Sequence, residues 1–525
     1  MNVGRVALDV ALGLALAAAF AAQMLRWLRV LQREHYAPRS MLQFIGRWSS
    51  PQVASAKSVA RASKKRPITL SQVLVVALLV TDLLHADVLV VLVTVLYGIF
   101  CPVGLSIKGR TSQLQWTRRL TTIALVATLA SLAVAVAGAF TVRSWVWSAA
   151  VVWAVPAALD IATRVLAPRE RRSSQKFVDQ AVARLARVKP RIVAITGSYG
   201  KTSTKNHLAD LLREDGGVVA SPRSFNNRAG LSRAINENLA DGTRIFIAEM
   251  GTYGPGEIRD LCSWCAPEIA VVTAIGPVHL ERMKSLDVID QAKFEVTEKA
   301  AVVVLNIDDV RLSRWVERLL QSAKRVRTCG SLVADASVRV EVAVPGWSII
   351  VDGTTLGTTP AVAGVQPTNL ACAIGCALEL GLGIDQVMAR VARVGTVANR
   401  SNVATAASGV VVIDDTFNAN PASAAAALKL LSSLKLTGRL VVVTPGLIEL
   451  GPEQYGENMS LAQKVGVAGA ELVVVGRTNV RPMEIGYAKP VRRFDTRERA
   501  VDWVRSSLAP GDGVLYLNDL PDHYP

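Results

Sequence analysis

The 525-residue sequence is poor in cysteine and, over its first third, poor in acidic residues. Its six cysteines are too few and too scattered for a dense disulfide framework, which favours a reducing compartment. The lone C-x-x-C motif, Cys262-Ser-Trp-Cys265, has no further metal ligands nearby at a suitable spacing. We therefore interpret its two cysteines as ordinary buried thiols and not as part of a zinc site.

The shortage of acidic residues concentrates the positive charge at the N-terminus. Residues 1–176 hold 21 Lys and Arg against 6 Asp and Glu, a net +15 of the chain's +17. The remaining residues are close to neutral, which argues against a nucleic-acid-binding surface there. A basic N-terminal region is instead typical of a segment that faces anionic lipid headgroups.

Long apolar runs fill the same region. They are Val6–Ala22, Ile68–Leu105, 120–141 and 144–163, and the second run is almost twice the roughly 20 residues that cross a bilayer. Charge follows the first run more than it precedes it, so we expect a retained helix with its N-terminus outside, not a cleaved signal peptide. Basic residues separate the runs and should remain in the cytoplasm. These rules predict about five transmembrane helices in a bacterial plasma membrane, with Asp82 and Asp87 in an outer turn and the rest of the chain in the cytoplasm.

From about residue 177 the pattern changes to short β-rich segments that alternate with helical ones. The expected strands are Arg191–Thr196, Arg244–Glu249, Ile269–Ala274, Val302–Asn306, Gly409–Asp414, Arg439–Thr444, Glu471–Val475 and Gly513–Leu517. The clearest expected helices are Lys201–Glu214, Pro367–Gly381 and Pro421–Leu434. This alternation predicts α/β domains, each with a parallel sheet covered by helices on both faces.

A glycine-rich loop lies between the first expected strand and the first expected helix. It reads Gly197-Ser-Tyr-Gly-Lys-Thr-Ser203, a G-x-x-G-K-[ST] pattern with a tighter glycine spacing than the usual phosphate-binding loop. Glycine lets the backbone wrap around a phosphate, and the helix N-terminus attracts negative charge. We expect ATP to contact Gly197, Ser198, Gly200, Lys201, Thr202 and Ser203, with Lys201 at the β- and γ-phosphates and Thr202 on Mg²⁺.

Several segments after this loop occur in a recognisable order. They are Ser224-Phe-Asn-Asn227, Ile247-Ala-Glu-Met-Gly251, Val278-His-Leu-Glu281, Ala292-Lys-Phe-Glu295, Leu305-Asn-Ile-Asp-Asp309, Ile413-Asp-Asp-Thr-Phe-Asn-Ala-Asn-Pro421 and Glu449-Leu-Gly451. Together with the compact loop they resemble the Mur ligase family over about residues 188–480. Within that family they are most similar to the MurF-like branch, which adds D-alanyl-D-alanine.

The resemblance implies domains at 1–176 (transmembrane), 177–398 (central, ATP-binding) and 399–525 (smaller, Rossmann-like). It implies an ATP-dependent amide ligase of peptidoglycan precursor synthesis that acts through an acyl phosphate. Its substrates would be a peptide- or amino-acid-bearing carboxylate and an amine.

The resemblance also assigns residues to roles. It implies two Mg²⁺ sites, formed by Thr202, Glu249, His279 and a carbamate on Lys293, and it makes Lys201, Lys293 and His279 catalytic. It adds Asn369, Arg400 and Asp415 to the ATP site, and Asn226, Asn227, Asn418 and Asn420 to the acceptor side. Without the resemblance, His279 would be read as structural, Lys293 as a solvated helix residue, and Asn418 and Asn420 as turn and cap residues.

The sequence departs from the MurF-like pattern in three main places. The segments around Gly364–Asn369 and Val397–Val403 differ from the family's G-x-H-N-x-x-N and G-R-x-E/F patterns. Membrane helices replace the expected UDP-binding domain, and the family's G-D-M-x-E-L-G becomes Pro445-Gly-Leu-Ile-Glu-Leu-Gly451. A lipid-linked substrate therefore stays open. So do three other functions: a polyglutamate-type ligase, an ATP-driven transporter (although no LSGGQ motif is present) and an inactive scaffold.

Overall fold

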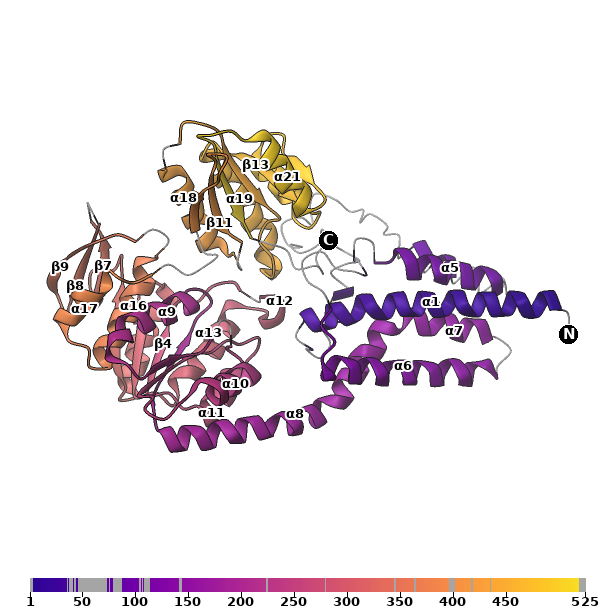
Figure 1. The fold of residues 1–525 in the computed structure, drawn as a ribbon, viewed down its shortest axis with the longest axis horizontal. Helices are drawn as coiled ribbons and strands as arrows, with labels where there is room; N and C mark the ends of the chain where they lie inside the picture. Colours follow the sequence, from indigo (N-terminus) through magenta and orange to yellow (C-terminus); the bar gives the residue numbers. More distant parts are fainter. Residues whose placement is uncertain are drawn as a thin grey trace.

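The computed structural model has three parts: an N-terminal helical bundle, a large α/β domain and a smaller α/β domain (Figure 1). It describes residues 3–34, 36, 41, 44–45, 73–74, 76–78, 87–102, 105, 107, 114–140, 144–222, 225–278, 280–343, 346–362, 365–395, 402–416, 419–434 and 436–518. We refer to the two α/β parts as the middle and C-terminal domains.

The bundle contains α1, α5, α6, α7 and the first part of α8, which lie side by side (Figure 1). Their bounds are α1 Val3–Arg33, α5 Asp87–Phe100, α6 Arg118–Ala139, α7 Ser144–Trp153 and α8 Val155–Val188. Two helices, Val6–Arg33 and Arg118–Ala139, are long and apolar enough to cross a membrane. A third span is counted if the bent pair α7–α8 is one span. The described residues thus support two or three spans and do not confirm five; most of the predicted hairpin's first half, with Asp82, lies outside them.

The predicted span over 144–163 is bent in the structure. The pair Trp145–Trp153 and Val155–Val188 meets at 65°. Pro156 stands in the first turn of α8. Proline supplies no backbone N–H and its ring clashes with the preceding turn, so the helix cannot continue straight through it.

Two basic side chains of α1 are buried, in contrast to the expectation that they face lipid headgroups. Arg26 and Arg29 are 5% and 6% exposed. Arg26 Nη1 donates to the carbonyl oxygen of Cys101 at 3.0 Å, and Gln23 Nε2 donates to the same oxygen at 2.7 Å. These side chains satisfy carbonyl groups that the end of α5 leaves without helical partners.

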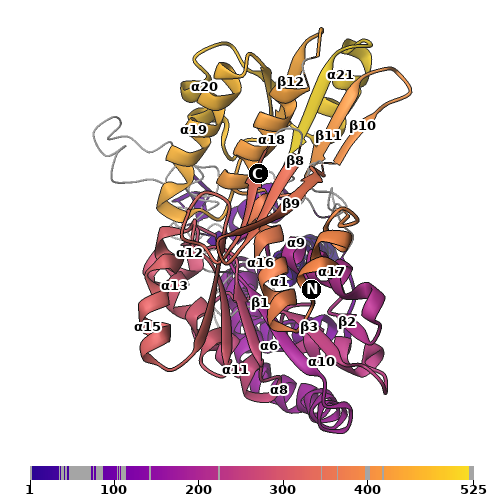
Figure 2. The ribbon, with the colours of Figure 1, turned by 90° about the vertical axis from the view of Figure 1, so that its left-hand side faces the viewer.

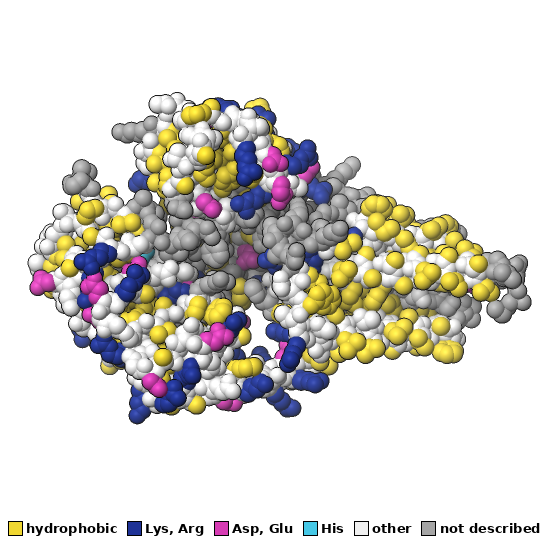
Figure 3. All heavy atoms as spheres, viewed as in Figure 1, with side chains coloured by type: hydrophobic (Ala, Val, Ile, Leu, Met, Phe, Trp, Pro, Cys, Tyr) yellow, Lys and Arg dark blue, Asp and Glu magenta, His cyan; other side chains and the backbone are white. Residues whose placement is uncertain are grey.

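Exposed apolar side chains surround the bundle, and they form a broad hydrophobic surface in Figure 3. Leu14 on α1 is 68% exposed, and Leu125 and Leu129 on α6 are 57% and 55% exposed. Apolar patches of this extent on a helical bundle indicate contact with lipid or another apolar partner.

The middle domain is built on a nine-stranded sheet of order β2-β3-β1-β4-β5-β6-β7-β8-β9. The strands are β1 Arg191–Thr196, β2 Val218–Ala220, β3 Ile245–Glu249, β4 Ile269–Val272, β5 Val302–Asn306, β6 Arg325–Gly330, β7 Val338–Val342, β8 Gly346–Val351 and β9 Thr354–Pro360. Neighbours from β2 to β7 pair in parallel, which confirms the predicted parallel sheet. The antiparallel extension by β8 and β9 was not predicted.

Helices cover both faces of this sheet (Figures 1 and 2). They are α9 Lys201–Leu212, α10 Arg228–Asn238, α11 Glu257–Trp264, α12 Leu280–Met283, α13 Leu286–Phe294, α14 Val310–Ser313, α15 Trp315–Gln321, α16 Pro367–Glu379 and α17 Ile384–Val391. Strand alternation gives each face its own core: Ala194 packs with α10 and α11, whereas Val193 and Ile195 pack with α9 and α16. The two buried faces explain the near-continuous apolar strands.

The C-terminal domain has a six-stranded sheet of order β10-β11-β15-β12-β13-β14 and stands above the middle domain in Figure 2. Its strands are β10 Asn402–Thr405, β11 Val411–Asp415, β12 Leu440–Thr444, β13 Glu471–Val475, β14 Arg492–Phe494 and β15 Gly513–Leu517. Its helices are α18 Pro421–Ser433, α19 Gln454–Val467, α20 Val480–Tyr487 and α21 Arg497–Ser507. Only β10 pairs antiparallel within this described sheet.

Helix α8 connects the bundle to the middle domain without a break at residue 176. Leu159, near its start, packs in the bundle core, and Leu185, near its end, packs in the core of the middle domain. The connection is helical throughout, although Pro168 lies inside α8 and removes one of its backbone hydrogen bonds.

All six cysteines are free and buried. Burial raises the pKa of the Cys262 and Cys265 thiols to about 12. Protonated, buried thiols of this kind agree with the interpretation from the sequence.

Candidate active site

The glycine-rich loop follows β1 and ends at the first turn of α9, as predicted. Gly197 has φ 148° and Gly200 has φ 79°, conformations that other residues rarely adopt. A Cβ atom at Gly197 would lie 2.0 Å from Thr273 Oγ1, and one at Gly200 would lie 2.2 Å from Asn369 Oδ1. Both glycines are therefore required by space as well as by conformation.

Side chains of the loop hold it against the neighbouring strand ends. The Ser198 hydroxyl donates to the carbonyl oxygen of Gly276 at 3.0 Å and accepts from the Gly276 N–H at 2.9 Å. Lys201 Nζ donates to the Gly197 carbonyl oxygen at 2.6 Å, so its ammonium lies over the loop. Ser203 follows on α9, and Asn369 from α16 abuts the loop at Gly200. The loop, Lys201 and Asn369 are thus together, as an ATP site requires.

Glu249 ends β3 beside the loop and is 1% exposed. Its Oε2 accepts from Thr202 Oγ1 at 2.9 Å and from Lys205 Nζ at 3.1 Å, and its Oε1 accepts from Asn226 Nδ2 at 3.2 Å. Burial alone would raise the pKa of Glu249, but the charges of Lys205 and Lys201 and these hydrogen bonds lower it. The result is a buried, ionised carboxylate next to a hydroxyl, a donor set that suits a hard cation such as Mg²⁺.

Lys205 is a site residue that the sequence analysis missed. Its side chain is 2% exposed and also donates to the Ser221 carbonyl oxygen at 2.8 Å. The four-residue spacing between Lys201 and Lys205 could have indicated this role. The two lysines are one helical turn apart, so both can reach the end of β3. A lysine at that spacing also fits a solvated helix face, which is why it was passed over.

Lys293, on α13, is 5% exposed, which excludes the reading as a solvated helix residue. Burial lowers the pKa of Lys293 well below its ordinary value, and the nearby charge of Lys201 lowers it further. A neutral amine is the form that reacts with CO₂ to give a carbamate. The surroundings of Lys293 therefore suit the carbamate that the family resemblance implies.

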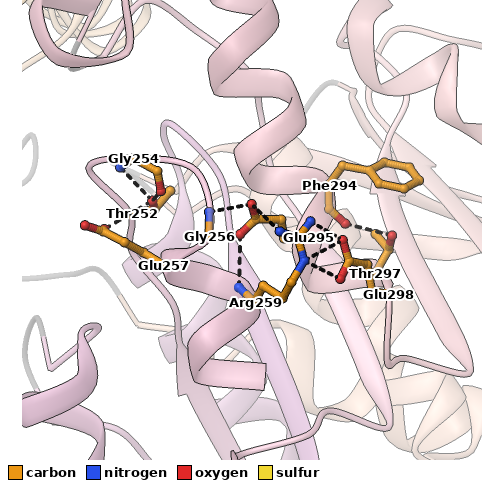
Figure 4. Close-up of polar contacts among 9 residues, drawn as sticks. All are labelled: Thr252, Gly254, Gly256, Glu257, Arg259, Phe294, Glu295, Thr297 and Glu298. Atoms are coloured by element: carbon orange, nitrogen blue, oxygen red, sulfur yellow. Dashed lines mark hydrogen bonds and ion pairs between the residues drawn. The ribbon is translucent and has the colours of Figure 1, made fainter. Parts of the chain in front are cut away.

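Glu295 joins the segment after β3 to the helix that carries Lys293 (Figure 4). It is 3% exposed, and its carboxylate accepts from the N–H of Gly256 at 2.6 Å and of Arg259 at 3.0 Å. Arg259 in turn pairs with Glu298, with its Nη2 2.6 Å from Oε1. A carboxylate at a helix N-terminus is favourable, and here it fixes α11 to the end of α13. We infer that the E of the A-K-x-E segment has a structural role.

The two aspartates of the N-x-D-D segment also bind backbone. Asp309 Oδ2 accepts from the Ile275 N–H at 2.6 Å, and Asp308 Oδ2 accepts from the Ser331 N–H at 2.7 Å. The bond of Asp309 holds the loop after β4, and the bond of Asp308 holds the segment after β6.

The expected residues of the C-terminal domain are less tied to this site. Asp415 ends β11 and is 4% exposed, on the sheet of the other domain. Asn420 caps α18, and its Oδ1 accepts from the N–H of Ala422 and of Ser423. In the middle domain Asn227 caps α10 in the same way, whereas Asn226 contacts Glu249 and so lies at the expected metal site. His279, Arg400 and Asn418 lie outside the described residues, and their roles stay predictions.

The two α/β domains meet beside the site. The Leu280 N–H donates to the Glu449 carbonyl oxygen at 3.1 Å. Burial raises the pKa of Tyr199 in the glycine-rich loop, and the carboxylate of Glu457 on α19 raises it further. The C-terminal domain therefore places acidic groups close to the loop.

A cavity of about 510 Å³ opens in the C-terminal domain beyond this contact. It is lined by Gln454, Tyr455, Arg477, Thr478, Asn479, Val480, Arg481, Pro482, Glu484 and Arg493. Asn479 fixes its wall by donating to the carbonyl oxygens of Pro445 and Leu447, each at 3.0 Å. The arginines make it a candidate site for an anionic group, which the sequence analysis did not identify.

Among the described residues, no group of three or more His, Cys, Asp or Glu side chains could hold a metal ion. The candidate site instead combines one carboxylate, one hydroxyl and a lysine.

Comparison with known proteins gives two domain matches. Residues 195–362 match the Mur ligase middle domain, and residues 399–517 match the glutamate ligase domain of Mur ligases.

Two similar proteins share one name and come from mycobacteria. UDP-N-acetylmuramoyl-tripeptide--D-alanyl-D-alanine ligase of Mycobacterium leprae is 31% identical over 363 residues, which cover 62% of this chain and 70% of that protein. The enzyme of the same name from Mycobacterium tuberculosis is 34% identical over 344 residues, 62% of this chain and 67% of that protein.

Solved structures agree in fold. MurF ligase from Thermotoga maritima, in complex with ADP, superposes with a TM-score of 0.58 at 24% identity and covers 66% of this chain and 80% of that one. MurF from Acinetobacter baumannii gives a TM-score of 0.57 at 21% identity, with 66% and 77% covered.

Proposed function

The chain belongs to the Mur ligase family of ATP-dependent amide-forming ligases, and from this premise we propose which reaction it performs and where. Its relatives are named for joining D-alanyl-D-alanine to a UDP-N-acetylmuramoyl tripeptide. We propose that this chain joins an amine of that dipeptide class to the carboxylate of a peptidoglycan precursor peptide. The observation that carries the proposal is the buried, ionised Glu249 between Thr202 and Lys205, next to the glycine-rich loop.

The proposed reaction has two steps. The substrate carboxylate takes the γ-phosphoryl group of ATP, which gives an acyl phosphate and ADP. The amine then attacks the acyl carbon, and phosphate leaves. Lys201 lies where it can neutralise charge on the transferred group, and closure of the C-terminal domain would exclude water from the acyl phosphate.

Thr202 and Glu249 fit one Mg²⁺, and Lys293 as its carbamate, with His279, is our candidate for a second. Bound Mg²⁺ would supply positive charge to the phosphates. Lys205 and Asn226 orient Glu249, so the carboxylate is ready for the cation before it arrives.

The remaining assignments extend the proposal to substrates. We assign Asn369, Arg400 and Asp415 to ATP, and Asn226, Asn227, Asn418 and Asn420 to the acceptor side. Asn369 is supported by its contact with the loop. Asn420 uses Oδ1 for its cap, so its Nδ2 is the group that would meet the amine substrate.

We further propose that the bundle places the enzyme on the plasma membrane, with several spans, an outer N-terminus and cytoplasmic catalytic domains. Two features support this placement. Exposed apolar side chains lie on α1 and α6, and Lys and Arg side chains gather where the bundle meets the middle domain (Figure 3). Arg118 and Arg119 begin α6, and Arg164 lies in the first half of α8. A membrane placement is compatible with a lipid-linked precursor as the carboxylate substrate.

Depletion of the protein in cells, followed by identification of the accumulated envelope precursor, tests the proposal. We expect a precursor that retains the free carboxylate and lacks the amine substrate. It would carry UDP or a lipid phosphate, which separates the two substrate classes. A normal precursor pool, or loss of solute uptake with intact precursors, would contradict it and favour a transporter.

A further inference from the structure

The end of the first membrane helix contacts the catalytic part of the chain through one acidic side chain. Glu34 follows α1 and is the single acidic residue between Asp9 and Asp82, in a strongly basic stretch. Its Oε2 lies 2.6 Å from Nη2 of Arg282, and the side chain is 5% exposed. A buried carboxylate in a basic segment that pairs 248 positions away indicates a specific contact between the bundle and the middle domain.

Arg282 is held on a second side by an aromatic ring. Its guanidinium carbon lies 4.7 Å from the ring centroid of Tyr253, in the segment that follows Glu249 and β3. The side chain of Arg282 is 19% exposed. An arginine with both an ion pair and a stacked ring has little freedom, because each contact fixes the plane of the guanidinium group.

Arg282 belongs to α12, a single short turn that reaches three parts of the site. The turn starts at Leu280, whose N–H binds the Glu449 carbonyl oxygen of the C-terminal domain at 3.1 Å. It ends at Met283, two residues before Ser285, which caps α13, the helix that carries Lys293. In the sequence it directly follows His279, the proposed metal ligand. Figure 1 shows α12 facing the end of α1.

We propose that Glu34 is a positioning residue for the Mg·ATP site, acting through Arg282 on the α12 turn. The inference rests on the proposed function and extends it: the end of a membrane helix helps to order the segment from Leu280 to Lys293. Four residues form too short a helix to hold its own geometry, so α12 depends on contacts from outside. Glu34 supplies one of them from the bundle, and the Glu449 backbone supplies another from the C-terminal domain.

The test measures Mg²⁺-dependent binding of ATP to the full-length protein in lipid nanodiscs, with no peptide or amine present. Glu34→Gln removes the charge and keeps the shape. We expect it to raise the Mg²⁺ concentration needed for ATP binding roughly tenfold, as happens when residues that orient metal ligands are replaced. Glu237→Gln is the matched control, since Glu237 pairs with Arg233 on the surface of the same domain and both are more than half exposed.

A double-mutant cycle shows whether the pair acts as one unit. We expect Arg282→Gln to weaken Mg²⁺-dependent ATP binding as Glu34→Gln does. The double variant should bind no more weakly than the single variant with the larger defect. Arg282→Lys, which keeps the charge, should recover most of the binding. A thermal melt of each variant separates positioning from folding, because a change in melting temperature with an unaltered Mg²⁺ requirement would show a merely structural pair and overturn the proposal.

Two other outcomes would also overturn it: additive effects of the two substitutions, or a Glu34→Gln variant that binds Mg·ATP like Glu237→Gln. Failure of the proposed function looks different. A wild-type protein that binds Mg·ATP but forms no amide with any precursor peptide would contradict the substrate assignment, while the Mg²⁺ requirement of the variants would still decide the role of Glu34.

Discussion

The two α/β domains place polar side chains at the ends of parallel strands, but use them differently. In the middle domain the end of β3 holds a buried charge, Glu249, which is met by Thr202, Lys205 and Asn226. In the C-terminal domain Asp415 ends β11, but the side chains that hold the loop after β12 are neutral amides. Asn458 and Asn479 bind the backbone of the loop at Leu447 and do not face a buried charge.

The difference separates the part of the reaction that relatives share from the part that can vary. The buried charge at the end of β3 suits the binding of ATP and Mg²⁺, which need a fixed electrostatic arrangement. In the C-terminal domain the neutral amides of Asn458 and Asn479 fix the conformation of a loop, Pro445–Gly451. This is the loop in which the sequence departs from the MurF-like pattern. We therefore expect substitutions at the end of β3 in the middle domain to lower activity strongly. Substitutions in the C-terminal domain should have smaller effects that concern one substrate.

Lys201→Ala should have the largest effect. Lys201 is the cation over the glycine-rich loop, and its loss leaves charge on the transferred phosphoryl group without a partner. We expect amide formation to fall roughly a thousandfold, with little change in thermal stability. Steady-state release of ADP and phosphate measures it; a variant that stays within a few fold of wild type would show that the loop does not serve catalysis.

Lys293→Ala should lower activity roughly a hundredfold, and added acetate should restore part of it by supplying the missing carboxylate oxygens. The wild type should also depend on pH through this residue. Because burial lowers the pKa of Lys293, the neutral amine persists to lower pH than in an exposed lysine, and it takes up a proton as the pH falls through that lowered pKa. An ammonium cannot form a carbamate, so activity should fall on acidification. At a pH above that pKa, added bicarbonate should raise the activity. Equal activity with and without CO₂ would rule the carbamate out.

Lys205→Met should weaken the binding of Mg²⁺ more than the binding of ATP. It removes a buried donor from Glu249 and one of the charges that lower the pKa of Glu249. We expect the Mg²⁺ requirement to rise roughly ten- to thirtyfold, measured by titration at saturating ATP. Lys464→Met on the exposed side of α19 is the control. An unchanged requirement would mean that Glu249 is held well enough without Lys205.

Asn420→Ser should have the smallest effect on activity, and the effect should concern only the amine substrate. Serine can still cap α18, so the melting temperature should stay close to that of wild type. The lost amide N–H should raise the KM for the amine roughly three- to tenfold and leave the KM for ATP unchanged. If both constants match wild type, Asn420 is a cap residue alone.

Much of both α/β domains could be predicted because the signals in the sequence are local. Buried parallel strands read as continuous apolar runs, and the sequence placed β1, β5, β13 and β15 with their observed bounds. The glycine-rich loop was predictable because both glycines are demanded by conformation and by contact.

The features that were missed depend on distant parts of the chain. Lys205 becomes a site residue only because the sheet brings Glu249 next to α9. Glu34 finds Arg282 only in the folded chain. The predicted boundary at residue 176 lies within α8 and stays a prediction. The charged run at Arg169–Arg172 suggests a boundary, but α8 continues through it because Ala181 and Leu185 pack on the middle domain.

The central claim is that this chain forms an amide through an acyl phosphate, and oxygen transfer tests it most directly. The full-length protein in nanodiscs would receive Mg·ATP, a precursor peptide with an ¹⁸O-labelled carboxylate, and D-alanyl-D-alanine. The account predicts one labelled oxygen in the released phosphate for each amide formed, with one ADP per amide. Phosphate without the label, or ATP turnover that needs neither the carboxylate nor the amine, would contradict it.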